Sequence, residues 1–178
     1  GAAGGTGLAA VQIGHALGAH VIAACSNDEK LHTAKQHGAD VAINTGKDDV
    51  RDAIKSLTGG AGADVIFDPV GGDLAKSLAR SVGWNGRWLV IGFADGAIPK
   101  VPLNLPLVKG YSIVGVFWGS FCDRDPAQAQ TNHGQLFEMA ASGKLTPHLH
   151  AVMPLNEAPC ALSQIEQRAV QGKIVLNP

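Results

Sequence analysis

Short apolar runs alternate with segments of helical spacing along most of the chain. The apolar runs cover residues 20–25, 40–44, 63–68, 87–93 and 112–118. Between them, helical spacing of apolar residues marks the segments at about 28–37, 50–57 and 73–82. Strands at this interval with helices between them are typical of βαβ units, and continuously apolar strands are typical of sheets covered on both faces. The pattern therefore predicts an α/β fold, with a parallel sheet between layers of helices.

The pattern changes after Gly119. We expect a helix over 126–142, a strand over 147–155, a helix over 156–170 and a closing strand over 173–177. The segment from about residue 146 is treated as separate from the main sheet.

The chain opens on a glycine-rich turn, GAAGGTG, that runs directly into an alanine-rich helical pattern. Gly4 and Gly7 occupy the second and third positions of the dinucleotide fingerprint G-x-G-x-x-G, with Ala2 at the first. In that fingerprint the second glycine lets the backbone approach a pyrophosphate, and the N-terminus of the helix attracts the phosphates. A plain structural turn is the alternative, but the strand after this helix favours dinucleotide binding. We expect the helix to pack on a sheet through one face, formed by Ala9, Ile13, Ala16 and Leu17.

The end of the next strand indicates which dinucleotide is bound. NAD-binding sites place a carboxylate there to bond the ribose 2′-hydroxyl. Here the strand ends in ACSN, without a carboxylate, and Lys30 follows one helical turn later. Hydroxyl and amide groups with a nearby cation suit a 2′-phosphate, so NADPH is favoured over NADH. Two other interpretations stay open: Ser26 and Glu29 also form a capping box, and Lys30 also suits a solvated helix surface.

Composition narrows the possible partners. The 178 residues suit one domain with a real core, and the net charge of −1 offers no basic field for nucleic acid. No apolar run is long enough for a membrane span. The three cysteines are far apart and odd in number, which argues against a disulfide framework and favours a reducing compartment. We expect a cytoplasmic protein with no nucleic-acid or membrane partner.

The remaining chemically capable residues form no recognisable catalytic site. His148 and His150 share one face of a strand, but no third ligand stands at metal-binding spacing, so no metal is expected. Cys25 reads as a small buried residue at a strand end. Asp68 fits either a shaping role at the cofactor crevice or a solvated loop anchor. No catalytic residue is assigned.

A family resemblance extends over nearly the whole chain. It is carried, in order, by AAGGTGLAAVQIGHALGAHVIAACSNDEK, HGADVAIN, FDPVGG, GRWLVIGFADG, VKGYSIVGVFWG and GKIVLNP. These motifs resemble the zinc-independent, zeta-crystallin-like quinone oxidoreductases of the medium-chain dehydrogenase/reductase superfamily. The resemblance implies a Rossmann fold, a doubly wound parallel sheet, that lacks its first strand. Residues 1–145 would form the NAD(P)-binding domain, and residues 146–178 the return segment of a GroES-like catalytic domain that is otherwise absent.

The resemblance also implies cofactor contacts, position by position. The pyrophosphate turn would comprise Ala3, Gly4, Gly5, Thr6 and Gly7. Ser26 and Lys30 match the 2′-phosphate positions. Thr45 stands where family members often carry a tyrosine, which weakens one contact to that phosphate. Arg168, in the last predicted helix, resembles another phosphate-binding arginine; a cation placed to favour the helix dipole is the alternative.

Further contacts follow from the ends of the later strands. Val70 would pack on the adenosine side of the cofactor. The nicotinamide end would be lined by Ile91, Gly92, Phe93, Val116, Phe117 and Trp118. The two aromatic residues of this set also fit a core or a dimer interface.

In function, the resemblance implies an NADPH-dependent reductase that passes a hydride to a quinone or another α,β-unsaturated carbonyl. An enoyl reductase, an alcohol dehydrogenase-like enzyme of the same superfamily and a non-catalytic dinucleotide-binding module are the alternatives. A homodimer is expected through the edge of the strand at 112–118. With half of the substrate cleft absent, this chain by itself is expected to show little catalysis.

Overall fold

The predicted strands are present in the computed structural model, which describes residues 1–178, but they form three separate parallel sheets. The first is a pair, β1 (Ile22–Cys25) with β2 (Val41–Asn44). The second has the order β3 (Ala63–Asp68), β4 (Val82–Val90), β5 (Ser112–Gly115). The third pairs β6 (Leu149–Pro154) with β7 (Lys173–Asn177). The segment after residue 146 thus forms a sheet of its own.

All the strand pairs of the three sheets are parallel, and helices connect successive strands, as the alternating pattern of the sequence predicts. The predicted fold class, α/β with parallel strands, is therefore confirmed.

The chain divides into two units with dense internal contacts, Gly1–Gly46 together with Gly134–Pro178, and Lys47–His133. We call them unit 1 and unit 2. This division does not test the domain boundary expected after residue 145, which stays a prediction.

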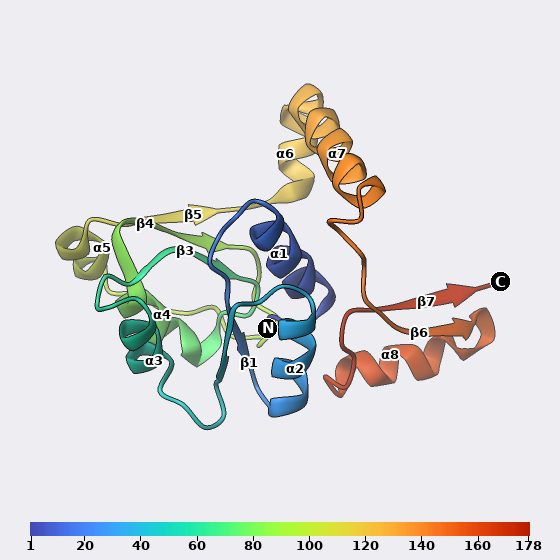
Figure 1. The fold of residues 1–178 in the computed structure, drawn as a ribbon, viewed down its shortest axis with the longest axis horizontal. Coiled ribbons are helices and arrows are strands. Elements are labelled where there is room, and N and C mark those ends of the chain that lie inside the picture. The colour runs from blue at the N-terminus through green and yellow to red at the C-terminus, as the bar shows by residue number, and fades with distance from the viewer. The chain divides into compact units, whose positions relative to one another are not determined.

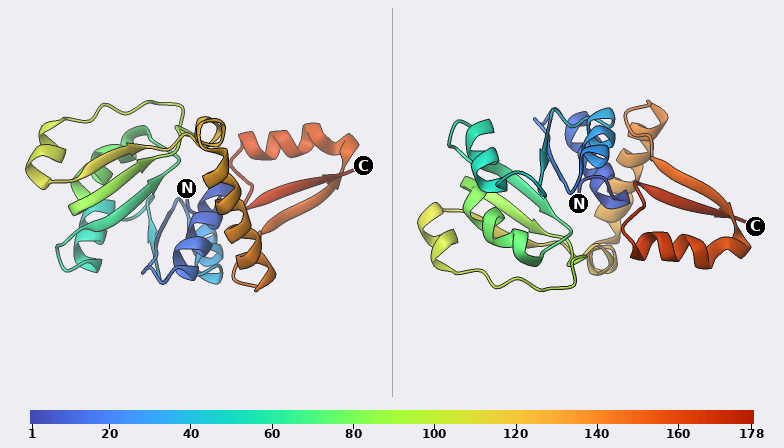
Figure 2. Two further views of the ribbon diagram at one scale, coloured as in Figure 1. Left: turned by 90° about the horizontal axis from the view of Figure 1, so that it is seen from above. Right: turned by 90° about the horizontal axis from the view of Figure 1, so that it is seen from below.

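Unit 1 contains α1 (Gly5–Ala16), α2 (Asp28–Gln36), η2 (Leu155–Glu157) and α8 (Ala158–Glu166) beside its two sheets. Its best-buried cluster consists of small residues: Ala3, Val11, Ala23, Cys25, Ala34 and Ala39. Such side chains let α1, α2 and β1 approach closely. In Figures 1 and 2, α8 runs along the β6–β7 pair, as the crossover of a parallel βαβ unit does.

The buried face of α1 differs from the predicted one. Leu8, Val11 and Gln12 are buried, whereas Ala9 and Leu17 are exposed. The predicted face was wrong because α1 is small or apolar almost all round, so its periodicity is weak. Gln12 is buried because its amide satisfies the backbone of Thr146: Nε2 donates to the Thr146 carbonyl at 3.0 Å, and Oε1 accepts from its N–H at 2.7 Å.

Unit 2 contains helical segments in addition to its three-stranded sheet (Figure 1). They are α3 (Val50–Leu57), η1 (Gly72–Leu74), α4 (Ala75–Ser81), α5 (Asn104–Lys109) and α6 (Trp118–Arg124), and α7 (Pro126–Ala141) crosses into unit 1. Trp88 and Val82 of β4 are fully buried. Neither α5 nor α6 was expected from the sequence pattern. No helix combines the length and apolar character that a membrane span needs.

Two predicted strands end earlier than expected. The run 87–93 belongs to β4, which spans Val82–Val90, and the run 112–118 belongs to β5, which ends at Gly115. The predicted ends were wrong because the apolar character continues past the last ladder position into the loops. Ile91, Gly92 and Phe93 thus follow β4, and Val116 and Phe117 lie between β5 and α6.

A buried carboxylate joins the end of β3 to β4. Asp68 is 5% exposed, and its Oδ1 accepts hydrogen bonds of 3.0 Å from the N–H groups of Val70 and Gly71. Its Oδ2 accepts from Trp88 Nε1 at 3.2 Å. Asp68 is therefore a buried anchor of the loop after β3, and the expectation of a solvated anchor was wrong.

Replacing Asp68 should destabilise unit 2 strongly. In Asp68→Ala, three donors around the site lose their acceptor, and each buried unsatisfied donor costs about 1–3 kcal/mol. We expect the free energy of unfolding, measured by urea denaturation, to fall by about 3 kcal/mol or more. Asp64→Ala is the control, because Asp64 is exposed on the same strand. Equal loss in both variants would contradict the anchoring role.

Candidate dinucleotide site

The glycine turn leads into α1 with an open N-terminus. Gly4 is the N-cap residue, with φ −74° and ψ 166°, and no side chain caps the helix. The first turn contains no acidic residue. The N–H groups of Gly5, Thr6 and Gly7 have no acceptor within the helix, because the first residues of any helix lack one. These donors, with the positive end of the helix dipole, form a site suited to a phosphate.

The glycines of this turn meet different steric demands. A Cβ on Gly7 would lie 2.7 Å from Ala2 Cα and 2.8 Å from the Ala2 carbonyl carbon, so only glycine lets α1 pack on the opening segment. A Cβ on Gly5 would lie 2.6 Å from Lys173 Cε. At Gly4 the nearest atom would be the Gly1 carbonyl oxygen at 3.6 Å, an ordinary contact. Of these three positions, the backbone approach that requires glycine is at Gly7.

The start of β7 lies directly against this turn. Gly172 bridges to Gly4, and its N–H donates to the Ala3 carbonyl at 2.9 Å. The Lys173 side chain extends over Gly5 at the beginning of α1. Lys173 was not among the predicted contacts, because GKIVLNP was interpreted as a closing strand and a family motif; the basic residue at the strand start was the available signal.

Lys30 and Arg168 come together although 138 residues separate them. Lys30 Nζ donates to the Arg168 carbonyl at 2.8 Å. Arg168 lies beyond α8, which ends at Glu166, and adopts a left-handed backbone with φ 57°. Its expected place within the last helix was wrong, because the helix ends two residues earlier. The chain reversal at Arg168 brings it to α2.

Ser26 and Thr45 follow the paired ends of β1 and β2. Cys25 stands opposite Asn44 in the register, and the Thr45 N–H and hydroxyl both donate to the Cys25 carbonyl, at 2.8 and 3.2 Å. Ser26 is exposed. The cap of α2 is Asn27, whose Oδ1 accepts from the Lys30 N–H at 2.9 Å, so the Ser26 capping box was wrong. The Ser26 hydroxyl is not used as the cap.

Amide side chains engage the two carboxylates in the first turn of α2. Asn44 Nδ2 donates to Asp28 Oδ1 at 2.6 Å. Gln171 Nε2 donates to Glu29 Oε1 at 2.6 Å, and its Oε1 accepts from the Thr33 hydroxyl at 2.5 Å. Gln171 is only 7% exposed. No sequence signal marked it, because a glutamine gains this role only from its neighbours in the fold.

The other predicted contacts lie in unit 2, at the carboxyl edge of its sheet. Loops after β3, β4 and β5 are joined there: the Ile91 N–H donates to the Asp68 carbonyl, and the Val116 N–H to the Val90 carbonyl, both at 3.0 Å. Val70, Ile91, Gly92, Phe93 and Val116 thus belong to one edge of this sheet.

The two aromatic residues after β5 differ in environment. Trp118 stacks on Phe121 and meets His133 edge-on, with ring centroids 5.5 Å apart in each pair. Phe117 is 79% exposed. Trp118 thus packs against other rings of unit 2 on part of its surface and stays 45% exposed, whereas Phe117 presents most of its ring to solvent.

Cys25 and His148, which were not assigned as a catalyst or a metal ligand, make structural contacts. Cys25 is 3% exposed, and burial raises the pKa of its thiol, which leaves the thiol poorly reactive. His148 meets His37 edge-on at 4.8 Å, and burial, with smaller effects of His37 and His150, lowers its pKa. No three histidine, cysteine or acidic residues are grouped so that they could hold a metal ion.

Residues 5–133 match the family model described as zinc-binding dehydrogenase. The chain belongs to this family. Quinone oxidoreductase-like protein 2 of Mus musculus is 38% identical over 177 residues, which cover 99% of the chain and 51% of that protein. These matches confirm the predicted resemblance to quinone oxidoreductases of the medium-chain dehydrogenase/reductase superfamily.

Solved structures agree with this family assignment. The quinone oxidoreductase of Pseudomonas syringae pv. tomato DC3000 superimposes with a TM-score of 0.89 at 32% identity, over 99% of the chain and 55% of that protein. Escherichia coli quinone oxidoreductase complexed with NADPH gives a TM-score of 0.87 at 30% identity, with the same coverage. The chain spans about half the length of these relatives.

Alanine substitutions should separate the roles of the glycines. Gly7→Ala places a methyl group against the Ala2 backbone, so we expect loss of several kcal/mol of stability or failure to fold. Gly4→Ala adds a methyl group in ordinary contact at a φ that any residue adopts, and stability should change by less than about 1 kcal/mol. Thermal denaturation of both variants checks the pair; a stable Gly7→Ala protein would contradict the packing argument.

Proposed function

We propose that this chain is the NADPH-binding part of an oxidoreductase that transfers a hydride to a quinone or another α,β-unsaturated carbonyl. The observation that carries the proposal is the meeting of Lys30 with Arg168 beyond the carboxyl ends of β1 and β2. Lys30 Nζ uses one of its three hydrogens on the Arg168 carbonyl, which leaves two for an anion. Ser26 adds an exposed hydroxyl. This donor set fits a ribose 2′-phosphate.

Two carboxylates stand near this anion site. Asp28 and Glu29 keep their negative charge, but hydrogen bonds from the Asn44 and Gln171 amides hold one oxygen of each in place. Both carboxylates also stand in the first turn of α2, where the helix dipole favours negative charge. Thr45 supplies a smaller contact than a tyrosine would.

The diphosphate of the cofactor would rest on the turn formed by Ala3 to Gly7. The free N–H groups of the first turn donate to it, and the ammonium group of Lys173 adds a positive charge at the same helix end. A cation beside a helix N-terminus is unfavourable by itself, because both are positive, and a bound diphosphate reverses the sign of that interaction.

The unit 2 residues would serve the rest of the cofactor. Val70 would pack on the adenosine side, and Ile91, Gly92, Phe93, Val116, Phe117 and Trp118 would line the nicotinamide end. When bound, the nicotinamide supplies the hydride, and the protein holds and orients it. The complex of the Escherichia coli relative with NADPH supports this assignment.

Several properties of the whole protein belong to the same proposal. Residues 1–145 would form the cofactor domain and residues 146–178 the return segment of a catalytic domain. The protein would be a zinc-independent, cytoplasmic homodimer joined along β5. Turnover of NADPH by the full-length protein with a panel of quinones and enones tests the activity. NADPH binding without any turnover would instead favour a non-catalytic module.

Removing the Lys30 charge should weaken the binding of NADPH more than the binding of NADH. In Lys30→Met one charge-assisted contact to the 2′-phosphate is lost, so the Kd for NADPH should rise about tenfold, equivalent to about 1.4 kcal/mol. The Kd for NADH should change less than about twofold, since NADH has no such phosphate. Fluorescence titration measures both, with Lys35→Met on the same helix as the control. Equal loss of affinity for both cofactors would contradict the assignment of Lys30 to the 2′-phosphate.

Removing the Lys173 charge should change the affinities for the two cofactors in a different way from removing the Lys30 charge. Lys173→Met should weaken NADPH and NADH alike, by roughly five- to tenfold, because the diphosphate is common to both. Binding of 2′-AMP, which lacks the diphosphate, should be unchanged in Lys173→Met and weakened in Lys30→Met. Calorimetric titration distinguishes the two variants, with the exposed Lys144→Met as the control. An effect of Lys173→Met on 2′-AMP would argue against contact with the diphosphate.

A further inference from the structure

Four basic side chains surround a small pocket in unit 2, away from the proposed cofactor contacts. Arg51 and Lys55 come from α3, Arg80 from the last turn of α4, and Lys109 from the end of α5. The pocket has a volume of about 190 Å³ and is completed by Ile54, Gly60, Gly62 and Ser81. We call it the cation pocket.

The cation pocket lies at the amino edge of the β3–β4–β5 sheet. Gly62 immediately precedes β3, Ser81 immediately precedes β4, and Lys109 comes shortly before β5. The predicted cofactor contacts of unit 2 all follow the carboxyl ends of the same strands. The pocket is therefore on the opposite edge of the sheet and independent of the proposed function.

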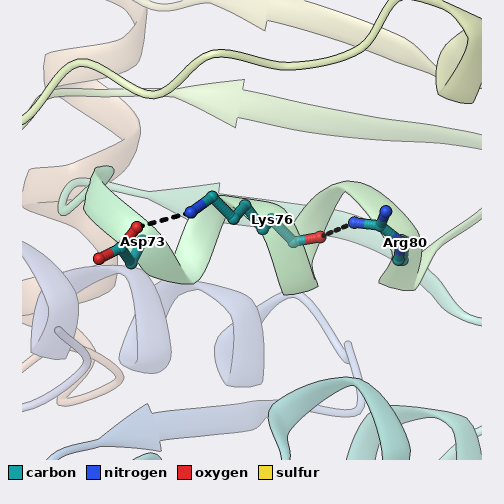
Figure 3. Close-up of polar contacts among 3 residues, drawn as sticks. All are labelled: Asp73, Lys76 and Arg80. Carbon is teal, nitrogen blue, oxygen red and sulfur yellow. Dashed lines mark hydrogen bonds and ion pairs between the residues drawn. The ribbon is translucent and has the colours of Figure 1, made fainter.

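No carboxylate lines the cation pocket. Asp73, in the turn before α4, pairs with Lys76 instead: Lys76 Nζ donates to Asp73 Oδ1 at 2.9 Å, as Figure 3 shows. Arg80 lies one turn further on, and its Nη1 donates to the Lys76 carbonyl at 3.0 Å (Figure 3). That bond fixes the guanidinium and leaves its other N–H groups for a ligand.

Lys109 is the most constrained of the four cations. Its Nζ donates to the Arg80 carbonyl at 2.6 Å, which places the ammonium group at the C-terminal end of α4. Burial, together with the charge of Arg51, lowers the pKa of Lys109. The carbonyl uses one of its three hydrogens, so two donors remain. A partly buried cation that faces another cation has an electrostatic cost that a bound anion would remove.

The neutral groups of the pocket already have partners. The N–H of Gly60 donates to the Lys55 carbonyl at 2.7 Å, the N–H of Gly62 to the Thr58 hydroxyl at 2.9 Å, and the Ser81 hydroxyl to the Ser77 carbonyl at 2.8 Å. Recognition would therefore depend on the four cations. Guanidinium and ammonium groups together are the usual ligands of phosphate oxygens.

We propose that the cation pocket is a second anion site, which binds a small phosphate-bearing anion such as a diphosphate or a phosphomonoester. Its volume admits one or two phosphate groups, and its charge complements theirs. Two adjacent phosphates would let cations from α3, α4 and α5 contact the ligand at once.

The test uses the whole ¹⁵N-labelled chain and sodium pyrophosphate at constant ionic strength. Proton–nitrogen correlation spectra should show saturable shifts at the Gly60 and Gly62 amides. In the double variant Arg51→Gln/Lys55→Gln the affinity at these amides should fall at least tenfold, because two of four charges are gone. Both side chains are exposed, so the fold should persist, and unchanged amide positions elsewhere verify this.

Two matched controls isolate the pocket. Lys76→Gln lies on α4 but outside the pocket, and it leaves the backbone carbonyl that holds Arg80; Arg124→Gln removes an exposed arginine elsewhere in unit 2. Both should keep the affinity within twofold. Equal shifts with sodium acetate, unchanged binding in the double variant, or shifts confined to Gly4–Gly7 would each overturn the second site. The last outcome would do so while leaving the proposed cofactor site intact, so failures of the two proposals are distinguishable.

Discussion

The contact between residues 171–173 and the glycine turn holds the candidate cofactor site together. Gln171 joins Glu29 and Thr33 of α2, and Gly172 bonds Ala3 and Gly4. Gln171 is 142 residues from Glu29 and 138 residues from Thr33. Because closing so long a loop costs conformational entropy, buried and fully paired hydrogen bonds of this kind are needed to hold it. Arg168 shortly precedes this contact in the chain and has its own bond to Lys30, and Lys173 is part of the contact.

Glycine has two distinct uses around this contact. At Gly7 and Gly5 the missing side chain makes room for a backbone or for the Lys173 stem. At Gly172 the backbone has a positive φ of 73°, and a Cβ would also meet the backbone of His148. Close backbone contacts at Gly7 and at Gly172 therefore fix the turn. The first N–H groups of α1 have no acceptor within the helix.

Unit 2 presents two edges of one parallel sheet with different chemistry. At the carboxyl edge, Asp68 holds the loop after β3 with hydrogen bonds that replace water inside the protein. At the amino edge, four cations gather without a carboxylate. Both arrangements follow from the parallel topology, which collects residues of several crossover segments at each end of the strands.

The sequence by itself determined the order of the strands, the parallel α/β fold and the glycine turn, because apolar runs, helical spacing and glycine act over short distances. It also singled out Lys30 and the absence of a carboxylate at the end of β1. The tertiary structure alone decided which face of α1 is buried, where β4 and β5 end, and that Asn27 caps α2 in place of Ser26. It alone brought Gln171 and Arg168 to α2 and Lys173 to the glycine turn, and it grouped Arg51, Lys55, Arg80 and Lys109. The physical reason is that these features depend on partners distant in sequence, and a glutamine or lysine has no preference for them until folding brings the partners together.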